Sequence, residues 1–442
     1  MKLFFVSLGC DKNLVDSEVM LGNLSEKGYS ITDDETDADV IVVNTCCFIN
    51  DAKEESIETI LEMAKLKQVG NLKALLVTGC LAQRYQDEIK KEIPEVDAIL
   101  GTSAIDMIVQ AVEDALSGNG HDYINALNLP AHSGTKRMVT TGGHFAYLKI
   151  AEGCDKHCSY CIIPKIRGNY RSVAMEELIA EAQKLVSDGV KELILVAQET
   201  TLYGMDLYKE KKLPELLEKL CDIEDLKWIR ILYCYPEEIT PELVAVIKNE
   251  EKICHYLDVP IQHASDKILK RMGRRTNREQ LIQKIALLRT EVPDICLRTT
   301  LITGFPGETQ EDHEILMDFV NEMEFDRLGV FTYSPEENTP AAEMEDQIDD
   351  EIKIARQSEI MELQQEIAFE NADKMIGRTL EVMVEGKVAD EDVYIARTYK
   401  DAPNVDGFLF FESEYSLMSG DFCKVRVTGT NEYDLLGEMI QE

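Results

Sequence analysis

The 442-residue sequence predicts an α/β protein with an N-terminal open parallel sheet, a partial (β/α)6 barrel and a small C-terminal all-β barrel. Three observations predict this fold. Short apolar runs alternate with amphipathic stretches over residues 1–140 and again over 141–375, as in βα units. The second region has six strand-like runs, too few to close an eight-stranded barrel. Residues 376–442 contain only short strand-like runs between Gly and Asp turns.

In residues 1–140 each apolar run is followed by a helix-like stretch, so we expect a parallel sheet with helices on its faces. The opening run lacks a small-residue cleavage site and is interpreted as a strand, not a signal peptide, which places the protein in the cytoplasm. A stretch rich in Gly, Asn, His and Thr, Gly118–Gly143, predicts a linker. The expected strands are Leu3–Leu8, Val40–Val43, Leu75–Thr78 and Ala98–Leu100, and the expected helices are Asn13–Lys27, Ala52–Lys67, Leu81–Glu92 and Ala104–Leu116.

The same alternation over 141–375 predicts an open barrel with its active face at the C-terminal ends of the strands. A long polar stretch, Gln347–Lys374, predicts a helix that leads into the third domain, 376–442. The expected barrel strands are Ala146–Ile150, Glu192–Val196, Trp228–Leu232, Tyr256–Val259, Cys296–Ile302 and Arg327–Phe331, and the expected strands of the third domain are Leu380–Val384, Val393–Ala396, Gly407–Phe411 and Cys423–Val427.

Composition and charge exclude several classes of protein. With 45% hydrophobic and 29% charged residues the chain is an ordinary globular protein, and no apolar run approaches the ~18 residues of a membrane span. The 46 basic and 83 acidic residues give a net charge of −37, which would repel a phosphate backbone. We therefore expect a basic protein as partner and no general nucleic-acid binding. A monomer is expected.

Twelve cysteines and only seven histidines indicate metal binding through thiolates in a reducing compartment. Cys154, Cys158 and Cys161 follow the first barrel strand, at its catalytic mouth. Three thiolates at this spacing can hold a cubane iron–sulfur cluster and leave its fourth iron without a protein ligand. Zinc would need a fourth ligand, and His157 lies between two ligands and would strain the turn. Structural zinc and free thiols are the alternatives.

A second set of cysteines follows the N-terminal strands. Cys10 comes after the first strand, Cys46 and Cys47 after the second, and Cys80 after the third. Because the C-terminal ends of parallel strands lie on one edge, we expect these thiols to meet in one crevice and hold a second cluster. Scattered buried thiols are the alternative. Neighbouring side chains on a strand end diverge, so only one of the adjacent pair can face the cluster, and spacing does not choose between them. The five other cysteines, expected to be small buried hydrophobic residues, are Cys221, Cys234, Cys254, Cys296 and Cys423.

The Cys154–Cys161 motif resembles that of the radical S-adenosylmethionine (SAM) enzymes, in which the open iron binds the cosubstrate and one electron cleaves it to a deoxyadenosyl radical. Tyr160, directly before the third cysteine, resembles an aromatic residue of that superfamily that lies near the adenine. Two further segments, Ser7–Asn13 and Cys161–Gly168, resemble the methylthiotransferase family. So does Asn44-Thr45-Cys46, in which the cysteine of the family motif is the ligand, and this selects Cys46 over Cys47.

The resemblance covers almost the whole chain and implies a methylthiotransferase N-terminal domain, a radical SAM domain and a TRAM domain. It implies two 4Fe-4S clusters, two uses of SAM, and addition of a methylthio group to the β-carbon of an aspartate in ribosomal protein S twelve of the small subunit. An unidentified low-potential electron donor is implied as well. The sister enzymes modify adenosine in transfer RNA. Residues 376–442 contain six basic and fourteen acidic residues, a net of −8, which favours the basic ribosomal protein. A non-catalytic iron–sulfur sensor or scaffold is the alternative from another class.

Polar residues at the ends of the barrel strands are candidates for contact with SAM. The glycine among them would permit close approach of the backbone to adenine. Arg274 and Arg275 are expected on the solvated surface instead. The candidates are Gln198 and Glu199 after the second strand, Gln262 after the fourth, Arg298 on the fifth and Gly304 after it.

Overall fold

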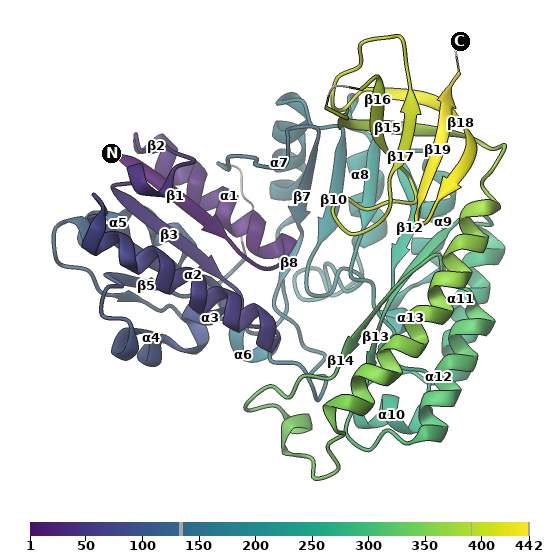
Figure 1. Cartoon of the computed structure of the whole chain (residues 1–442), viewed down its shortest axis with the longest axis horizontal. Coiled ribbons are helices and arrows are strands. Elements are labelled where there is room, and N and C mark those ends of the chain that lie inside the picture. Colours follow the sequence, from purple (N-terminus) through teal and green to yellow (C-terminus); the bar gives the residue numbers. More distant parts are fainter. Residues whose placement is uncertain (132–135, 390, 441–442) are drawn as a thin grey trace.

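The computed structural model describes residues 1–131, 136–389 and 391–440, and it confirms the predicted fold class. Two six-stranded parallel sheets and one closed barrel organise the chain (Figure 1). The strands of the two sheets run toward a common region around α6 (Ile163–Arg167) and β8 (Ala151–Glu152). In the described part of the chain, no helix has the length and apolar character needed to span a membrane.

The N-terminal sheet has the strand order β2-β1-β3-β4-β5-β6. Alternate residues of each strand face opposite helices. Val40 and Val42 pack with α1 and α5, whereas Ile41 and Val43 pack with α2, α3 and α4. Both faces are therefore buried, which explains the continuous apolar runs. The elements are β1 (Lys2–Ser7), α1 (Asp11–Glu26), β2 (Ser30–Ile31), β3 (Val40–Thr45), α2 (Asn50–Val69), β4 (Ala74–Thr78), α3 (Gly79–Arg84), α4 (Gln86–Glu92), β5 (Ala98–Leu100), α5 (Ile108–Leu116) and β6 (Asp122–Tyr123).

Two details of this domain differ from the prediction. The sheet has six strands and not four, because β2 and β6 are two-residue edge strands too short to form an apolar run. The second of them lies inside the expected linker Gly118–Gly143, of which residues 132–135 fall outside the described ranges. The expected helix Leu81–Glu92 is two helices, because Tyr85 leaves helical geometry with φ −122° and ψ 35°.

The second sheet is an open barrel with the order β14-β13-β12-β11-β10-β7, so the prediction of six parallel strands is confirmed. Its helices lie on the outside of the sheet (Figure 1). The strands are β7 (Phe145–Lys149), β10 (Glu192–Val196), β11 (Trp228–Ile231), β12 (Ile253–Asp258), β13 (Cys296–Thr303) and β14 (Arg327–Thr332), and the helices are α7 (Met175–Ser187), α8 (Leu213–Cys221), α9 (Pro241–Asn249), α10 (Asp266–Arg271), α11 (Arg278–Glu291), α12 (Gln310–Met323) and α13 (Asp350–Asp373).

The C-terminal domain is a closed barrel in the order β15-β16-β17-β19-β18. It has five strands where four were predicted. The missed strand, β19, has the sequence Asp-Leu-Leu-Gly-Glu-Met, whose interior glycine weakens the strand pattern. The strands are β15 (Thr379–Lys387), β16 (Val393–Thr398), β17 (Leu409–Glu412), β18 (Phe422–Asn431) and β19 (Asp434–Met439).

This small barrel packs over the N-terminal ends of the larger one. Arg397 of β16 is fully buried and donates to Glu192 Oε2 at 2.6 Å, and Arg230 Nε donates to Glu192 Oε1 at 2.8 Å. Trp228, the only tryptophan of the chain, lies edge-on to Phe422 with the ring centroids 5.0 Å apart. Buried ion pairs and an aromatic contact therefore fix the position of the third domain.

Replacing Arg397 with Met should lower the free energy of unfolding by about 3–5 kcal/mol, because Glu192 and Glu385 would each lose a buried partner. Guanidinium denaturation followed by Trp228 fluorescence would measure the effect at this interface. Lys387→Met removes an exposed ion pair with Asp392 in the same domain and should change the stability far less than Arg397→Met, because solvent screens that pair. Equal losses in the two variants would contradict this account.

Candidate metal centres

The structure places the ends of β1, β3 and β4 side by side. Ser7 pairs with Asn44, and Asn44 pairs with Thr78. Cys46 and Cys80 each lie two residues beyond these paired positions, so the two thiols leave the sheet at the same level. Cys10, in the connection between β1 and α1, is close enough to interact electrostatically with both of them.

Two glycines allow the cysteine segments to approach one another. Gly9 has φ +88°, and a Cβ at this position would lie 2.7 Å from Cys46 Cβ and 2.9 Å from Cys46 Sγ. Gly79 has φ +92°, and a Cβ there would lie 2.3 Å from Asn44 Oδ1. Any larger side chain would push the strand ends apart. The Gly-Cys pairs at Cys10 and Cys80 therefore have a steric reason.

Cys46 and Cys47 have different surroundings. Burial is the main cause that raises the pKa of the Cys46 thiol, and both Cys10 and Arg167 also act on it. Burial raises the pKa of Cys47 to about 12, and the titratable neighbours that act on it are Cys80, Arg84 and Cys46. The Cys47 side chain is fully buried in the apolar cluster under α2. Cys46 is thus the member of the pair that interacts with both Cys10 and Cys80.

Asn13 joins two of the three cysteine segments. Its Nδ2 donates to the carbonyl of Leu8 at 2.6 Å and to that of Thr45 at 3.3 Å. Ser56 of α2 bonds both the N–H and the carbonyl of Cys46, at 3.0 and 2.9 Å. The backbone on which the thiols stand is therefore fixed by side chains of two helices.

The second group of cysteines lies in the connection between β8 and α6. Cys154 and Cys158 are 8% and 5% exposed, and Cys161 is half-buried. Burial and, to a lesser extent, Cys158 raise the pKa of Cys154 to about 12. Burial, Cys158 and Cys154 raise the pKa of Cys161. The three thiols therefore share one site. His157, between two of the cysteines, is exposed and has φ +53°.

Residues from distant elements close over Cys158. The Tyr235 hydroxyl forms a 2.8 Å hydrogen bond with Cys158 Sγ. The guanidinium of Arg274 lies 4.0 Å from the centre of the Tyr235 ring, and Lys156 Nζ lies 4.6 Å from it. The expectation that Arg274 is on the solvated surface was wrong, because it is 7% exposed and donates to the Pro260 carbonyl. Arg275 is exposed, as expected.

Two of the predicted SAM contacts lie beside the Cys154 loop. Gln198 Oε1 accepts from the N–H of Gly153 at 2.8 Å, so this side chain holds the loop. Glu199 is fully buried, and burial raises its pKa to about 7 although Thr201 and Lys156 oppose the shift. Its charge therefore changes near neutral pH.

The other predicted contacts are more scattered. Tyr160 packs edge-on against Phe305. Arg298 lies 3.7 Å from Asp258 and 3.8 Å from Asp406 of the C-terminal domain. Gln262 has φ +72° and bridges to β13 through its backbone. A Cβ on Gly304 would lie 2.1 Å from the Lys353 side chain of α13, so packing of that helix is sufficient reason for this glycine.

Several buried acceptors around the Cys154 loop have no hydrogen-bond donor among the described residues. They are Glu199 Oε2 and both carboxylate oxygens of Glu237. Buried polar atoms normally have partners, so these oxygens suit a ligand that bears amino or hydroxyl donors. Within the described ranges no three His, Cys, Asp or Glu side chains enclose a single metal ion. An iron–sulfur cluster is held differently, since each thiolate binds a separate iron.

The N-terminal cysteines face the mouth of the larger barrel. Tyr233, at the end of β11, donates to Asp11 Oδ1 at 2.8 Å, and its ring lies 3.3 Å from Lys12 Nζ. Both partners directly follow Cys10. The structure thus brings the two cysteine groups to one junction between the domains.

Sequence reasoning missed Tyr235, Arg274, Lys156, Asn13 and Arg167. Lys156 and Arg167 lie within or just after the cysteine motif, and Tyr235 follows a predicted strand, so position offered a signal for these three. For Arg274 the sequence shows only a basic surface-like run. Of the other cysteines, Cys221 and Cys423 are half-buried and not fully buried as expected.

Three family profiles match the chain. An uncharacterized protein family, UPF0004, matches residues 2–101, the radical SAM superfamily matches residues 148–320, and a TRAM domain matches residues 376–440. A protein described as ribosomal protein uS12 methylthiotransferase RimO from Lachnoclostridium phytofermentans is 63% identical over 99% of both chains. A protein of the same description from Clostridioides difficile is 50% identical over 100% of this chain and 99% of its own.

Solved structures share the fold at low identity. The radical SAM methyltransferase TsrM from Kitasatospora setae, with cobalamin and a 4Fe-4S cluster bound, has a TM-score of 0.56 at 13% identity and covers 89% of this chain and 80% of its own. The cobalamin-dependent SAM radical enzyme OxsB has a TM-score of 0.53 at 13% identity, covering 82% and 56%. At this identity the likeness concerns the fold alone.

Proposed function

The chain belongs to the RimO family of ribosomal protein uS12 methylthiotransferases, and from this premise we propose that it adds a methylthio group to the β-carbon of an aspartate of uS12 by radical SAM chemistry. The observation behind this proposal is the full-length identity of 63% to a relative of that description, with all six candidate cysteines at two neighbouring strand-end sites. We place the enzyme in the cytoplasm, with its ribosomal substrate. Its domains are proposed as residues 1–140, 141–375 and 376–442.

The cofactors of this family are two 4Fe-4S clusters and SAM. Cys154, Cys158 and Cys161 would hold one cluster, and Cys10, Cys46 and Cys80 the other. When bound, these groups supply the electron that cleaves SAM and the site from which the methylthio group is transferred. The six thiols must lose their protons on binding iron, so assembly releases protons.

The chain's own residues would orient SAM and exclude water. Glu199 Oε2 and the two carboxylate oxygens of Glu237, which have no hydrogen-bond donor among the described residues, would accept hydrogen bonds from its amino and hydroxyl groups. Gln198 fixes the loop at Gly153, and Tyr235 with Arg274 covers Cys158. These contacts shield the Cys154 site from water.

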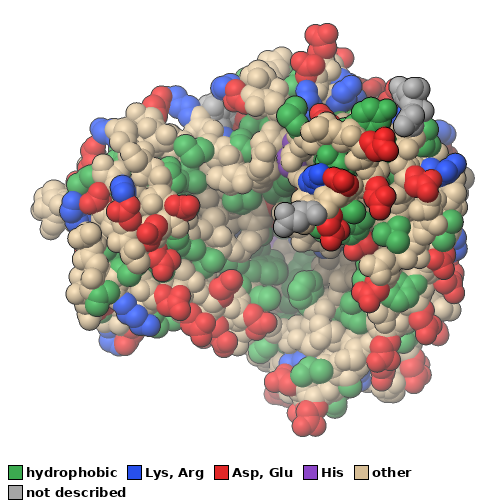
Figure 2. Space-filling view, turned by 45° about the horizontal axis from the view of Figure 1, so that its top comes forward, with side chains coloured by type: hydrophobic (Ala, Val, Ile, Leu, Met, Phe, Trp, Pro, Cys, Tyr) green, Lys and Arg blue, Asp and Glu red, His purple; other side chains and the backbone are tan. Residues whose placement is uncertain are grey.

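The charge distribution supports a basic protein substrate. The basic side chains of the C-terminal domain are largely engaged: Arg397 and Lys400 pair with acids of the larger barrel, and Lys387 and Arg426 pair within the domain. An RNA-binding barrel would present such residues as a basic stripe. Figure 2 shows a hollow between the N-terminal domain and the rest of the molecule, with apolar side chains on its floor and acidic side chains around it. Such a rim attracts a basic partner.

Incubation of the reconstituted enzyme with uS12 and, separately, unmodified transfer RNA should give methylthio incorporation into uS12, detected by mass spectrometry. Incorporation should fall as salt rises, because the Debye length shortens from ~10 Å at 0.1 M to ~3 Å at 1 M. SAM cleavage without protein substrate serves as the control and should depend little on salt. Incorporation into transfer RNA alone would overturn the protein-substrate proposal.

A further inference from the structure

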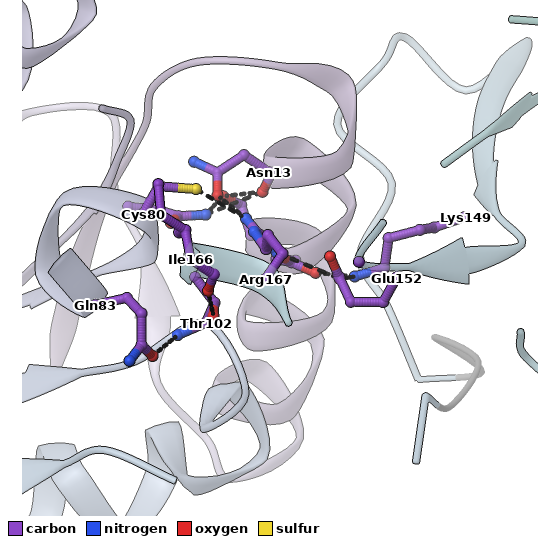
Figure 3. A network of polar contacts seen from close by, with 12 residues as sticks. Asn13, Cys80, Gln83, Thr102, Lys149, Glu152, Ile166 and Arg167 are labelled. Atoms are coloured by element: carbon purple, nitrogen blue, oxygen red, sulfur yellow. Dashed lines mark hydrogen bonds and ion pairs between the residues drawn. The ribbon is translucent and has the colours of Figure 1, made fainter. Parts of the chain in front are cut away.

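The side chain of Arg167 lies between Cys80 and Asn13 of the N-terminal domain and Glu152 of the barrel domain (Figure 3). It is the last residue of α6, in the barrel domain, and is 2% exposed. Its Nη2 donates to Cys80 Sγ at 3.4 Å and to Asn13 Oδ1 at 2.9 Å, and its Nη1 donates to Asp16 Oδ2 at 2.6 Å. All three partners belong to the N-terminal domain. One guanidinium therefore bonds a candidate ligand sulfur and helix α1 at the same time.

The same short segment also holds the other cysteine group. The carbonyl of Gly168 accepts from the N–H of Cys154 at 3.1 Å. Glu152 Oε2 accepts from Arg167 at 3.3 Å, and Glu152 Oε1 accepts from Gln198 at 2.9 Å. The same Gln198 side chain bonds the N–H of the residue before Cys154. A continuous chain of hydrogen bonds thus runs from Cys80 to the Cys154 loop.

Arg167 also completes the support of the N-terminal cysteines. Asn13 bonds the backbone on either side of the site, at Leu8 and Thr45, and offers its oxygen to Arg167. Arg167 holds the third cysteine segment through its hydrogen bond to Cys80 Sγ. Thr102 fixes α6 from the N-terminal domain by donating to the carbonyl of Ile166 at 2.9 Å. The cysteine segments and α6 therefore form one unit.

The charged side chains around Arg167 neutralise one another without a contribution from the Cys80 thiol. Arg167 and Lys149 provide two positive charges, and Asp16 and Glu152 provide two negative ones. A ligand cysteine is a thiolate. Hydrogen bonds and charges next to a ligand sulfur are among the properties that set a cluster's potential. The N–H group on Cys80 Sγ is thus suitably placed to act on the N-terminal cluster.

We propose that Arg167 is a positioning residue that orients the Cys80 thiolate, raises the reduction potential of the N-terminal cluster, and holds that cluster in register with the Cys154 site. This inference rests on the proposed function, because it requires a cluster at Cys10, Cys46 and Cys80. It adds a role for a residue that is not itself a ligand.

The test is a redox titration of the N-terminal cluster, followed by electron paramagnetic resonance, in the full chain with Cys154, Cys158 and Cys161 replaced by Ala. Arg167→Gln in this parent should shift the midpoint to a more negative potential, because a cation and a sulfur hydrogen bond are lost. Arg167→Lys keeps the charge, so its midpoint should lie between the midpoints of the parent and of Arg167→Gln. With all cysteines intact, Arg167→Gln should reduce methylthio transfer about 10–100-fold while SAM cleavage continues.

Arg84→Gln is the matched control. Arg84 also crosses the domain boundary with a largely buried side chain. It donates to Glu336 at 2.8 Å and to the backbone carbonyls of Cys47 and Glu337, and in the described part of the chain none of these bonds is to the sulfur of Cys10, Cys46 or Cys80. Its midpoint should equal that of the parent. Unchanged midpoints in both Arg167 variants would overturn the proposed role of Arg167 but leave the two-cluster proposal intact. A parent without iron would overturn the two-cluster proposal as well. If Arg167→Gln failed to fold, the midpoint of Arg167→Lys would decide.

Discussion

Replacing Cys154, Cys158 and Cys161 together with Ala should remove about half of the reconstituted iron and abolish deoxyadenosine formation. The three thiols share one site in the β8–α6 connection, whereas Cys10, Cys46 and Cys80 follow strands of the N-terminal sheet. The N-terminal cluster should therefore persist. Iron analysis and chromatography of the SAM products would measure the two effects.

The complementary variant is the matched control. Replacing Cys10, Cys46 and Cys80 with Ala should also remove about half of the iron but should leave SAM cleavage intact. Methylthio transfer should be lost in both variants. If the Cys154 variant lost all its iron, or still cleaved SAM, the assignment of two separate clusters would be wrong.

Cys46→Ala should lose the iron of the N-terminal site and all methylthio transfer, whereas Cys47→Ala should keep both. Cys46 interacts with Cys10 and Cys80, and its sulfur lies against Gly9. Cys47 points into the apolar cluster under α2 and is fully buried. Iron content measured in the Cys154/Cys158/Cys161 triple-Ala background would isolate this site.

The pair is its own control, because the two substitutions are chemically identical and adjacent. Cys47→Ala removes a buried sulfur from a core position and should cost some stability without loss of iron. The reverse pattern, with iron lost from Cys47→Ala only, would show that the second thiol is the ligand.

Much of the candidate site could be predicted because its signals are local or periodic. The Cys154–Cys158–Cys161 spacing lies within eight residues, and the positions of Cys10, Cys46 and Cys80 follow from three predicted strands that turned out to be neighbours. Spacing could not choose between Cys46 and Cys47, because the two residues are adjacent, so the prediction of Cys46 depended on the motif resemblance. Arg274 was misplaced because a basic run resembles a solvated surface, whereas the ring of Tyr235, from the connection after β11, covers it.

The sequence by itself determined the type and order of most elements, the six open βα units and the thiol-rich chemistry, because apolar periodicity and short motifs act over a few residues. The tertiary structure alone decided which side chains meet. Arg167 reaches Cys80 across 87 positions and Tyr235 reaches Cys158 across 77, so these contacts depend on how the sheets pack against one another. The tertiary structure also decided how the third domain packs on Glu192, because buried charges need partners that only folding brings together.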